Sequence, residues 1–232
     1  MNGLLGPNAL YMFILRAAAV LLVIPFHEAA HAFISWKLGD PTAKNAGRLS
    51  LNPLRHFDLL GTICMVVAGV GWAKPVHTDV RRFKNPKAGM AVTALAGPAA
   101  NLILAYLSMV VWKAVYYWAP VNEISWFATY FLQYMVLMNV GLAVFNLIPV
   151  PPLDGSRVLL VFLPPRLYFG IMRYEKAILA VLLAVVWFGA LNGPIAAATD
   201  FVWGLLYDGT GWVDAIASRV VVWDIIRSGT VV

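Results

Sequence analysis

The sequence predicts an all-α polytopic membrane protein, and three observations support this fold class. Hydrophobic residues make up 61% of the 232 residues, against roughly 45–50% in a typical soluble chain. Charged residues make up 12%, against roughly 25% in a soluble chain. Several largely uncharged stretches reach the length of about 20 residues that a spanning helix needs. This composition excludes a disordered chain, and a nucleic-acid partner is not expected.

The expected spanning helices follow from these uncharged stretches. They cover residues 9–36, 88–112, 126–148 and 177–199. The fourth is interrupted at Gly193 and Pro194. A shorter apolar stretch, 59–73, is rich in glycine and β-branched residues, so we expect a re-entrant or hairpin element there. One or more transmembrane or interfacial helices should follow Thr199, and the whole chain, 1–232, is expected to form a single integral membrane domain.

The basic residues predict how the chain is oriented in the membrane. Nine of the seventeen Lys and Arg residues lie in 37–87, whereas the linker 116–125 has none. Cytoplasmic loops are enriched in Lys and Arg. We therefore expect 37–87 and 155–176 in the cytoplasm and 116–125 on the outer side. The formal net charge of +6 is then a sign of topology and not of phosphate binding.

The first expected helix contains an H-E-x-x-H motif, His27-Glu28-Ala29-Ala30-His31. Positions i and i+4 share a helix face, so both imidazoles can reach one Zn²⁺. Glu28 is then placed to act as a general base on water bound to that ion. The alternative is a pair of packing histidines beside a snorkelling glutamate. Ionisable groups inside a bilayer are costly and usually functional, which favours a metal site.

A catalytic zinc site takes three protein ligands, so a third ligand must come from elsewhere in the chain. Most acidic residues lie in loops or beyond the last clear span. Asp154 differs, because it follows the span 126–148 directly and should lie at the same cytoplasmic end as His31. Three prolines before it prevent an ordinary helix, which opens the backbone at membrane depth. The alternative role for Asp154 is an N-cap of a helix over 156–162.

Four motifs together resemble a known family. They are HEAAH at 27–31, GWAKPV at 71–76, AGPAAN at 96–101 and NLIPVPPLDG at 146–155. In these motifs the sequence is similar to the site-2 protease family of intramembrane zinc metalloproteases, peptidase family M50, in its minimal bacterial type.

The resemblance has implications for the fold and the metal. It implies a three-helix catalytic core and a membrane re-entrant β-hairpin over 59–76. It also implies one Zn²⁺ per chain, held by the residues that match the family's ligands: His27, His31 and Asp154.

The resemblance further implies a function. Glu28 would be the catalytic base, and Asn146 would assist at the active site. The substrate would be a transmembrane helix of another protein, cut near the cytoplasmic face of a bacterial cell membrane. The alternative is a non-enzymatic metal transporter or haem-binding helix bundle that uses the two histidines. A transporter would spread polar groups along several spans, and a haem protein needs neither Glu28 nor Asp154.

Other polar residues carry weaker expectations. We expect Asn101 to serve helix packing or to support a metal ligand, because Gly97 and Pro98 beside it allow close helix approach. Asn139 is expected to form an interhelical hydrogen bond. His56, in the basic cytoplasmic region, is expected to be solvated and not a metal ligand.

Overall fold

The computed structural model describes residues 9–56, 58, 61, 63, 74 and 77–228. No strand occurs among these residues, and helices account for most of them. The expected hairpin over 59–76 lies almost entirely outside the described residues. The α-helices are α1 (Ala9–Lys37), α2 (Thr42–Asn45), α4 (Pro86–Trp118), α5 (Glu123–Asn146), α6 (Asp154–Leu160), α7 (Pro165–Met172), α8 (Glu175–Trp187), α9 (Asn192–Gly209) and α10 (Gly211–Ser228).

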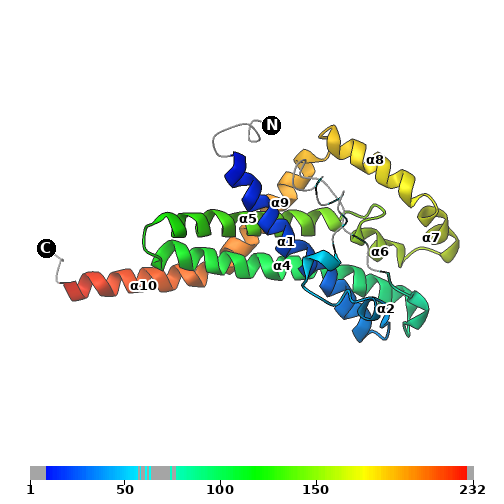
Figure 1. Cartoon of the computed structure of the whole chain (residues 1–232), viewed down its shortest axis with the longest axis horizontal. Coiled ribbons are helices and arrows are strands. Elements are labelled where there is room, and N and C mark those ends of the chain that lie inside the picture. The colour runs from blue at the N-terminus through cyan, green and yellow to red at the C-terminus, as the bar shows by residue number, and fades with distance from the viewer. Residues whose placement is uncertain are drawn as a thin grey trace.

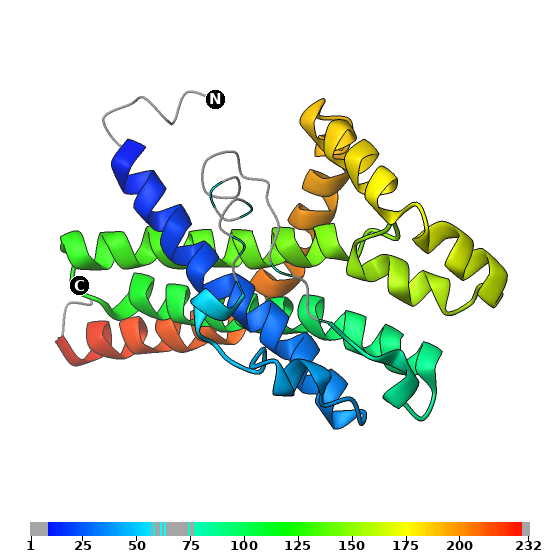
Figure 2. The same ribbon diagram turned by 45° about the vertical axis from the view of Figure 1, so that its right-hand side comes forward.

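Within the described part of the chain, three single helices are long and apolar enough to cross a membrane: α1 from Phe13, α4 and α5. In Figures 1 and 2, α4 and α5 lie side by side and α1 crosses both. The helices α7 and α8 project away from this bundle, and α9 returns to pack on α5 (Figure 1). The prediction of a mainly helical membrane protein is therefore confirmed.

Capping residues set where the two long central helices begin. Asn85 accepts a hydrogen bond from the amide of Ala88 at 3.2 Å, and Pro86 occupies the first turn of α4, where its missing N–H costs nothing. Asn122 and Ser125 form a reciprocal capping box at the start of α5. Only four residues, 119–122, separate the end of α4 from the capped start of α5, and so short a connection makes the two helices antiparallel neighbours.

The core lies between α4, α5 and α9 and extends to the crossing with α1. Ala105, Met109, Val136 and Val140 are fully buried where α4 meets α5, and residues of α9 pack against them. A second cluster, of Ala19, Val23 and Met135, fixes the crossing of α1 over α5. Small residues at these contacts let the helices approach closely.

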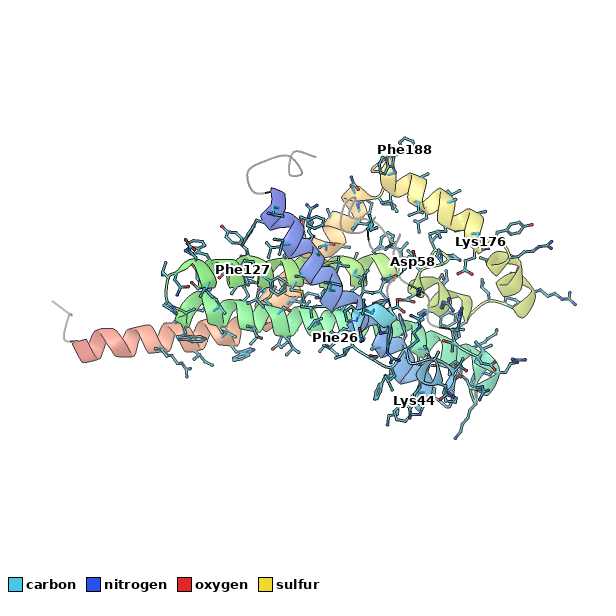
Figure 3. All side chains as sticks on the ribbon, viewed as in Figure 1. Phe26, Lys44, Asp58, Phe127, Lys176 and Phe188 are labelled. Atoms are coloured by element: carbon cyan, nitrogen blue, oxygen red, sulfur yellow. The ribbon has the colours of Figure 1, made fainter. Side chains whose placement is uncertain are left out.

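The fourth expected span, 177–199, is not one continuous helix. The structure breaks it into α8 and α9, which are bent by 83° relative to each other. The break is at Gly189, which has φ +76°. The amides of Gly189 and Ala190 donate to the carbonyls of Val186 and Val185, which is a Schellman motif. Figure 3 shows Phe188 at the outer tip of this bend.

An ion pair with a buried lysine attaches the C-terminal helices to α4. Lys113 is only 3% exposed, and its Nζ lies 2.5 Å from Oδ2 of Asp214 on α10. The same Nζ donates to the carbonyl of Tyr207 on α9 at 3.0 Å, and the hydroxyl of Tyr117 donates to the other oxygen of Asp214 at 2.9 Å. A lysine within a spanning helix is costly unless it is paired. The pair therefore couples the placement of α9 and α10 to α4.

A buried carboxylate holds the C-terminal end of α1. Asp40 is fully buried and accepts hydrogen bonds from the Ser35 hydroxyl at 3.1 Å, the Thr42 amide at 3.0 Å and the Asp79 amide at 2.8 Å. Burial raises the pKa of this carboxyl, but the donors from Thr42, Asp79 and Ser35 outweigh that effect and hold the pKa below its ordinary value. The carboxylate thus links the end of α1 to the segment that leads into α4.

We expect Asp40→Asn to lower the free energy of unfolding by about 1–3 kcal/mol. The substitution replaces one acceptor oxygen with an NH₂ group, so the buried donors that bonded to that oxygen lose their acceptor. The folded pKa of Asp40 lies below the unfolded value of about 3.9. Its stabilisation is therefore complete above about pH 5 and is lost as the pH falls through the folded value. Thermal unfolding of wild type and variant from pH 2 to pH 8 measures this.

The control is Asp208→Asn, because Asp208 is an exposed acidic residue. It should unfold like wild type across the pH range. An Asp40→Asn variant as stable as wild type at pH 7 would contradict the role assigned to this carboxylate.

Candidate metal centre

Two histidines lie one helical turn apart on the face of α1 that meets α4. His27 and His31 are 6% and 7% exposed. Their Nε2 atoms are 3.0 Å apart. The spacing of four residues predicts this shared face, and the structure places both rings inside the bundle.

Asp154, the first residue of α6, reaches the same point from a different part of the chain. Its Oδ2 lies 3.2 Å from Nε2 of His27 and 3.2 Å from Nε2 of His31. Among the described residues, these three form the one group of His, Cys, Asp or Glu side chains close enough to hold a metal ion. The N-cap of α6 is Leu153, and no side chain caps that helix. The capping role considered for Asp154 is therefore absent.

The turn before Asp154 is held tightly against the end of α5. A Cβ on Gly155 would lie 2.2 Å from the carbonyl oxygen of Leu147, which no real side chain tolerates. Glycine is therefore required directly after the acidic residue. From the other side, Nζ of Lys87 donates to the carbonyl of Leu163 at 2.8 Å, just beyond α6. These two contacts fix α6 against α5 and α4.

Hydrogen bonds orient both imidazole rings. Nδ1 of His31 lies 2.7 Å from the backbone oxygen of Thr93, and Nδ1 of His27 lies 2.5 Å from Oδ1 of Asn101. A carbonyl oxygen only accepts hydrogen bonds, so each ring donates from Nδ1. Each neutral ring then has a lone pair on Nε2, and both lone pairs point to the same place.

This arrangement fits a metal ion. Two Nε2 lone pairs and a carboxylate oxygen face one another without a proton between them, and buried Oδ2 of Asp154 accepts no hydrogen bond from the described residues. Such a set is repulsive unless a cation lies at its centre. Zinc bonds of about 2.0–2.2 Å at tetrahedral angles place neighbouring ligand atoms about 3.3 Å apart. The observed separations of 3.0–3.2 Å are close to that value.

Gly97 of α4 makes room for the two rings. A Cβ at this position would lie 2.4 Å from Nε2 of His31 and 2.6 Å from Nε2 of His27. Any side chain here would displace the atoms that face the metal position. The glycine of the AGPAAN motif was expected to serve helix packing, and its contact with the histidines was not anticipated.

The other two predicted site residues lie outside this cluster. Glu28 is half-buried on α1, next to His27 in sequence. Asn146 is the last residue of α5, and its Nδ2 donates to the carbonyl of Leu142 at 3.1 Å. Among the remaining histidines, His56 is fully buried, with Nε2 bonded to the carbonyl of Ser50 at 2.6 Å. The expectation that His56 is solvated was therefore wrong, because the loop folds over it.

An integral membrane protein with an H-E-x-x-H pair and a convergent carboxylate belongs, by fold and site, to the class of membrane metalloproteases. Comparisons with known proteins agree. The profile of the family described as Peptidase family M50 matches residues 114–189.

Three curated relatives carry the name "Putative zinc metalloprotease". YwhC of Bacillus subtilis is 41% identical over 63% of this chain and 68% of its own length. Rip2 of Mycolicibacterium smegmatis is 34% identical over 67% of this chain and 60% of its own length. Rip2 of Mycobacterium tuberculosis H37Rv is 30% identical over 78% of this chain and 70% of its own length.

This chain belongs to peptidase family M50. The resemblance predicted from the motifs is therefore confirmed, and so is the prediction of a metalloprotease. No solved structure matches the chain.

We expect Gly97→Ala to abolish stoichiometric metal binding while the bundle still forms, because the added methyl group occupies the space of the two Nε2 atoms. Metal content of the purified protein and its helical circular dichroism measure the two effects. Gly204→Ala is the matched control, because a Cβ at Gly204 of α9 meets nothing within 4 Å. Full metal content in Gly97→Ala would contradict the position assigned to the ion.

Proposed function

We propose that this protein is a zinc metalloprotease that hydrolyses a peptide bond in or near a transmembrane helix of another membrane protein. His27, His31 and Asp154 hold the zinc ion, and Glu28 is the catalytic base. The observation that carries the proposal is the convergence of the three ligand atoms within a bundle of membrane helices. The names of the relatives support zinc as the metal.

Bound Zn²⁺ lowers the pKa of a water molecule to near 7 and polarises the substrate carbonyl. Glu28 accepts a proton from the attacking water while the water oxygen forms a bond to the carbonyl carbon of the substrate. It then delivers that proton to the amide nitrogen as the carbon–nitrogen bond breaks. Glu28 is adjacent to a ligand but is not a member of the three-residue cluster, which leaves its carboxylate available for this proton transfer.

Asn146 is proposed to assist the substrate. One hydrogen of its amide group is donated to Leu142, and an amide group carries two such hydrogens. The second can be donated to the carbonyl of the scissile bond, where negative charge develops during attack. The position of Asn146 at the end of α5, eight residues before Asp154, supports this role.

The depth of the site supports a transmembrane substrate. His31 precedes Lys37, the last residue of α1, by six residues, which is about 9 Å along a helix. The ligands therefore lie inside the membrane but near one face. The basic residues of 37–87 favour the cytoplasmic face of the cell membrane. A β-hairpin over 59–76 that pairs with the unwound substrate remains an expectation from the family resemblance.

The geometry disfavours the haem alternative. Two imidazoles on opposite faces of a haem, each with a metal–nitrogen bond of about 2 Å, would have nitrogens about 4 Å apart. The two Nε2 atoms are 3.0 Å apart, and Asp154 lies beside both. A porphyrin plane cannot fit between them. A transporter would need ligands at further depths, whereas the described metal-binding group lies at one depth.

We expect Glu28→Gln to lose proteolysis of a model transmembrane substrate, by roughly 10²-fold or more, while it keeps bound zinc. His27→Ala should lose both zinc and proteolysis. Parallel measurement of zinc content and cleavage of the reconstituted substrate separates base from ligand. Full activity of Glu28→Gln would remove the proposed mechanism, and zinc retained by His27→Ala would remove the proposed ligand set.

The proposed orientation predicts the accessibility of two introduced cysteines. In a Cys64→Ser background, Leu54→Cys should be shielded from an impermeant thiol reagent added to intact cells, and Val121→Cys should react. The side chains at these positions are 82% and 88% exposed, so burial in the protein does not account for a difference. Both should react in permeabilised cells. The reverse labelling pattern would place the site at the outer face.

A further inference from the structure

A chain of hydrogen bonds leads from His27 through two other helices. Oδ1 of Asn101 on α4 lies 2.5 Å from Nδ1 of His27. Nδ2 of Asn101 donates to Oδ1 of Asn139 on α5 at 2.8 Å. Nδ2 of Asn139 donates to the backbone oxygen of Met135 at 2.8 Å. Both asparagines are 0% exposed, so bulk water does not compete for these groups.

The direction of this chain is fixed at its far end. The carbonyl of Met135 only accepts, so Asn139 must turn its NH₂ group toward it and its oxygen toward Asn101. Asn101 must then present its NH₂ group to Asn139 and its oxygen to His27. Because that oxygen only accepts, His27 must carry its proton on Nδ1. Its Nε2 therefore keeps the lone pair that faces Asp154.

We propose that Asn101 and Asn139 are positioning residues that hold His27 as the Nδ1–H tautomer and so present Nε2 to the metal. This inference rests on the proposed function, because it concerns the metal held by the same ligands. Neither asparagine touches the metal position or the substrate. The two act through His27 alone.

The two histidines are oriented by different means. Nδ1 of His31 donates directly to a backbone carbonyl, that of Thr93, which no side-chain substitution removes. His27 has no such carbonyl and depends on two side chains from two helices. Without them, its proton can move to Nε2, where it would block the metal. Metal binding should therefore be sensitive to substitution of the side chains that orient His27.

A role in helix packing alone makes a different prediction. Leucine has the same number of side-chain heavy atoms as asparagine and the same branching at Cγ, so packing would tolerate Asn101→Leu or Asn139→Leu better than a buried charge. The proposed relay requires an oxygen opposite Nδ1 of His27, which leucine lacks. An aspartate at 101 has an acceptor oxygen in both positions of its carboxylate and no N–H group that could face His27. Carboxylates orient zinc-bound histidines in this way in other proteins.

The test measures the apparent zinc affinity of the metal-free full chain in detergent, by competition with a chromophoric chelator. We expect Asn101→Leu to weaken affinity by about 10–100-fold, the range for partners of metal-bound histidines. Asn139→Leu should weaken the zinc affinity several-fold, because the side-chain amide of Asn101 can then rotate and place its NH₂ group opposite His27. Asn101→Asp added to Asn139→Leu should restore affinity. Ser108→Ala, a buried polar change farther along α4, should leave it unchanged.

The melting temperature of each metal-free protein is measured as well, to show that the variant folds. If one leucine variant does not fold, the other leucine variant provides the test. Affinity within about threefold of wild type in a folded leucine variant, or weaker affinity in the double variant than in Asn139→Leu, would overturn the relay. A wild type that binds no zinc would instead overturn the proposed function. Zinc binding without cleavage would remove the proposed proteolysis and leave the relay standing.

Discussion

The structure depends on the close approach of three lone pairs inside a membrane bundle. Two imidazole nitrogens and one carboxylate oxygen lie 3.0–3.2 Å from one another, and when both rings are neutral with the proton on Nδ1, no proton lies between these three atoms. Repulsion of this kind persists only where packing enforces it, and a divalent cation removes it. The arrangement of α1, α4 and α6 can therefore be understood as the means by which the protein keeps these three atoms together.

The neighbouring helices restrict the position and orientation of the two imidazole ligands. Gly97 lets α4 approach until the rings rest on its backbone, and Asn101 and Thr93 on the same helix fix how the rings are turned. Asn139 connects that orientation to α5. A buried polar group without a partner is costly in a membrane, and these contacts give Nδ1 of each imidazole and the amide groups of Asn101 and Asn139 buried partners.

Sequence periodicity and motif spacing predicted much of this. The spacing of His27 and His31 predicts a shared face, and the position of Asp154 after a span, behind three prolines, predicts that it reaches the same end. The roles of Gly97 and Asn101 toward the histidines were not predictable to the same degree, because they arise from the crossing of two helices distant in sequence. Composition alone suggested packing at Gly97 and left two roles open for Asn101.

Two differences from expectation have local physical causes. The stretch 177–199 was expected to be interrupted at Gly193 and Pro194, whereas a Schellman motif at Gly189 ends α8 earlier. A hydropathy profile does not indicate that a single glycine has a positive φ and ends a helix. His56 was expected to be solvated because it lies in a basic loop, yet the backbone of Ser50 folds over it. In both cases a backbone conformation, and not a composition, decided the outcome.

The ligand set joins two parts of the protein that are held in different ways. The histidines belong to the buried bundle, where the helix carbonyls of Thr93 and Met135 determine the direction of the hydrogen bonds that orient the two rings. Asp154 belongs to a short helix that an exposed lysine, Lys87, contacts from the N-terminal end of α4. Exposed contacts are weak and screened by salt, whereas the buried network is not. The two nitrogen ligands are therefore held by buried hydrogen bonds, whereas the carboxylate is held by the close packing of Gly155 on the end of α5 and by the exposed contact of Lys87.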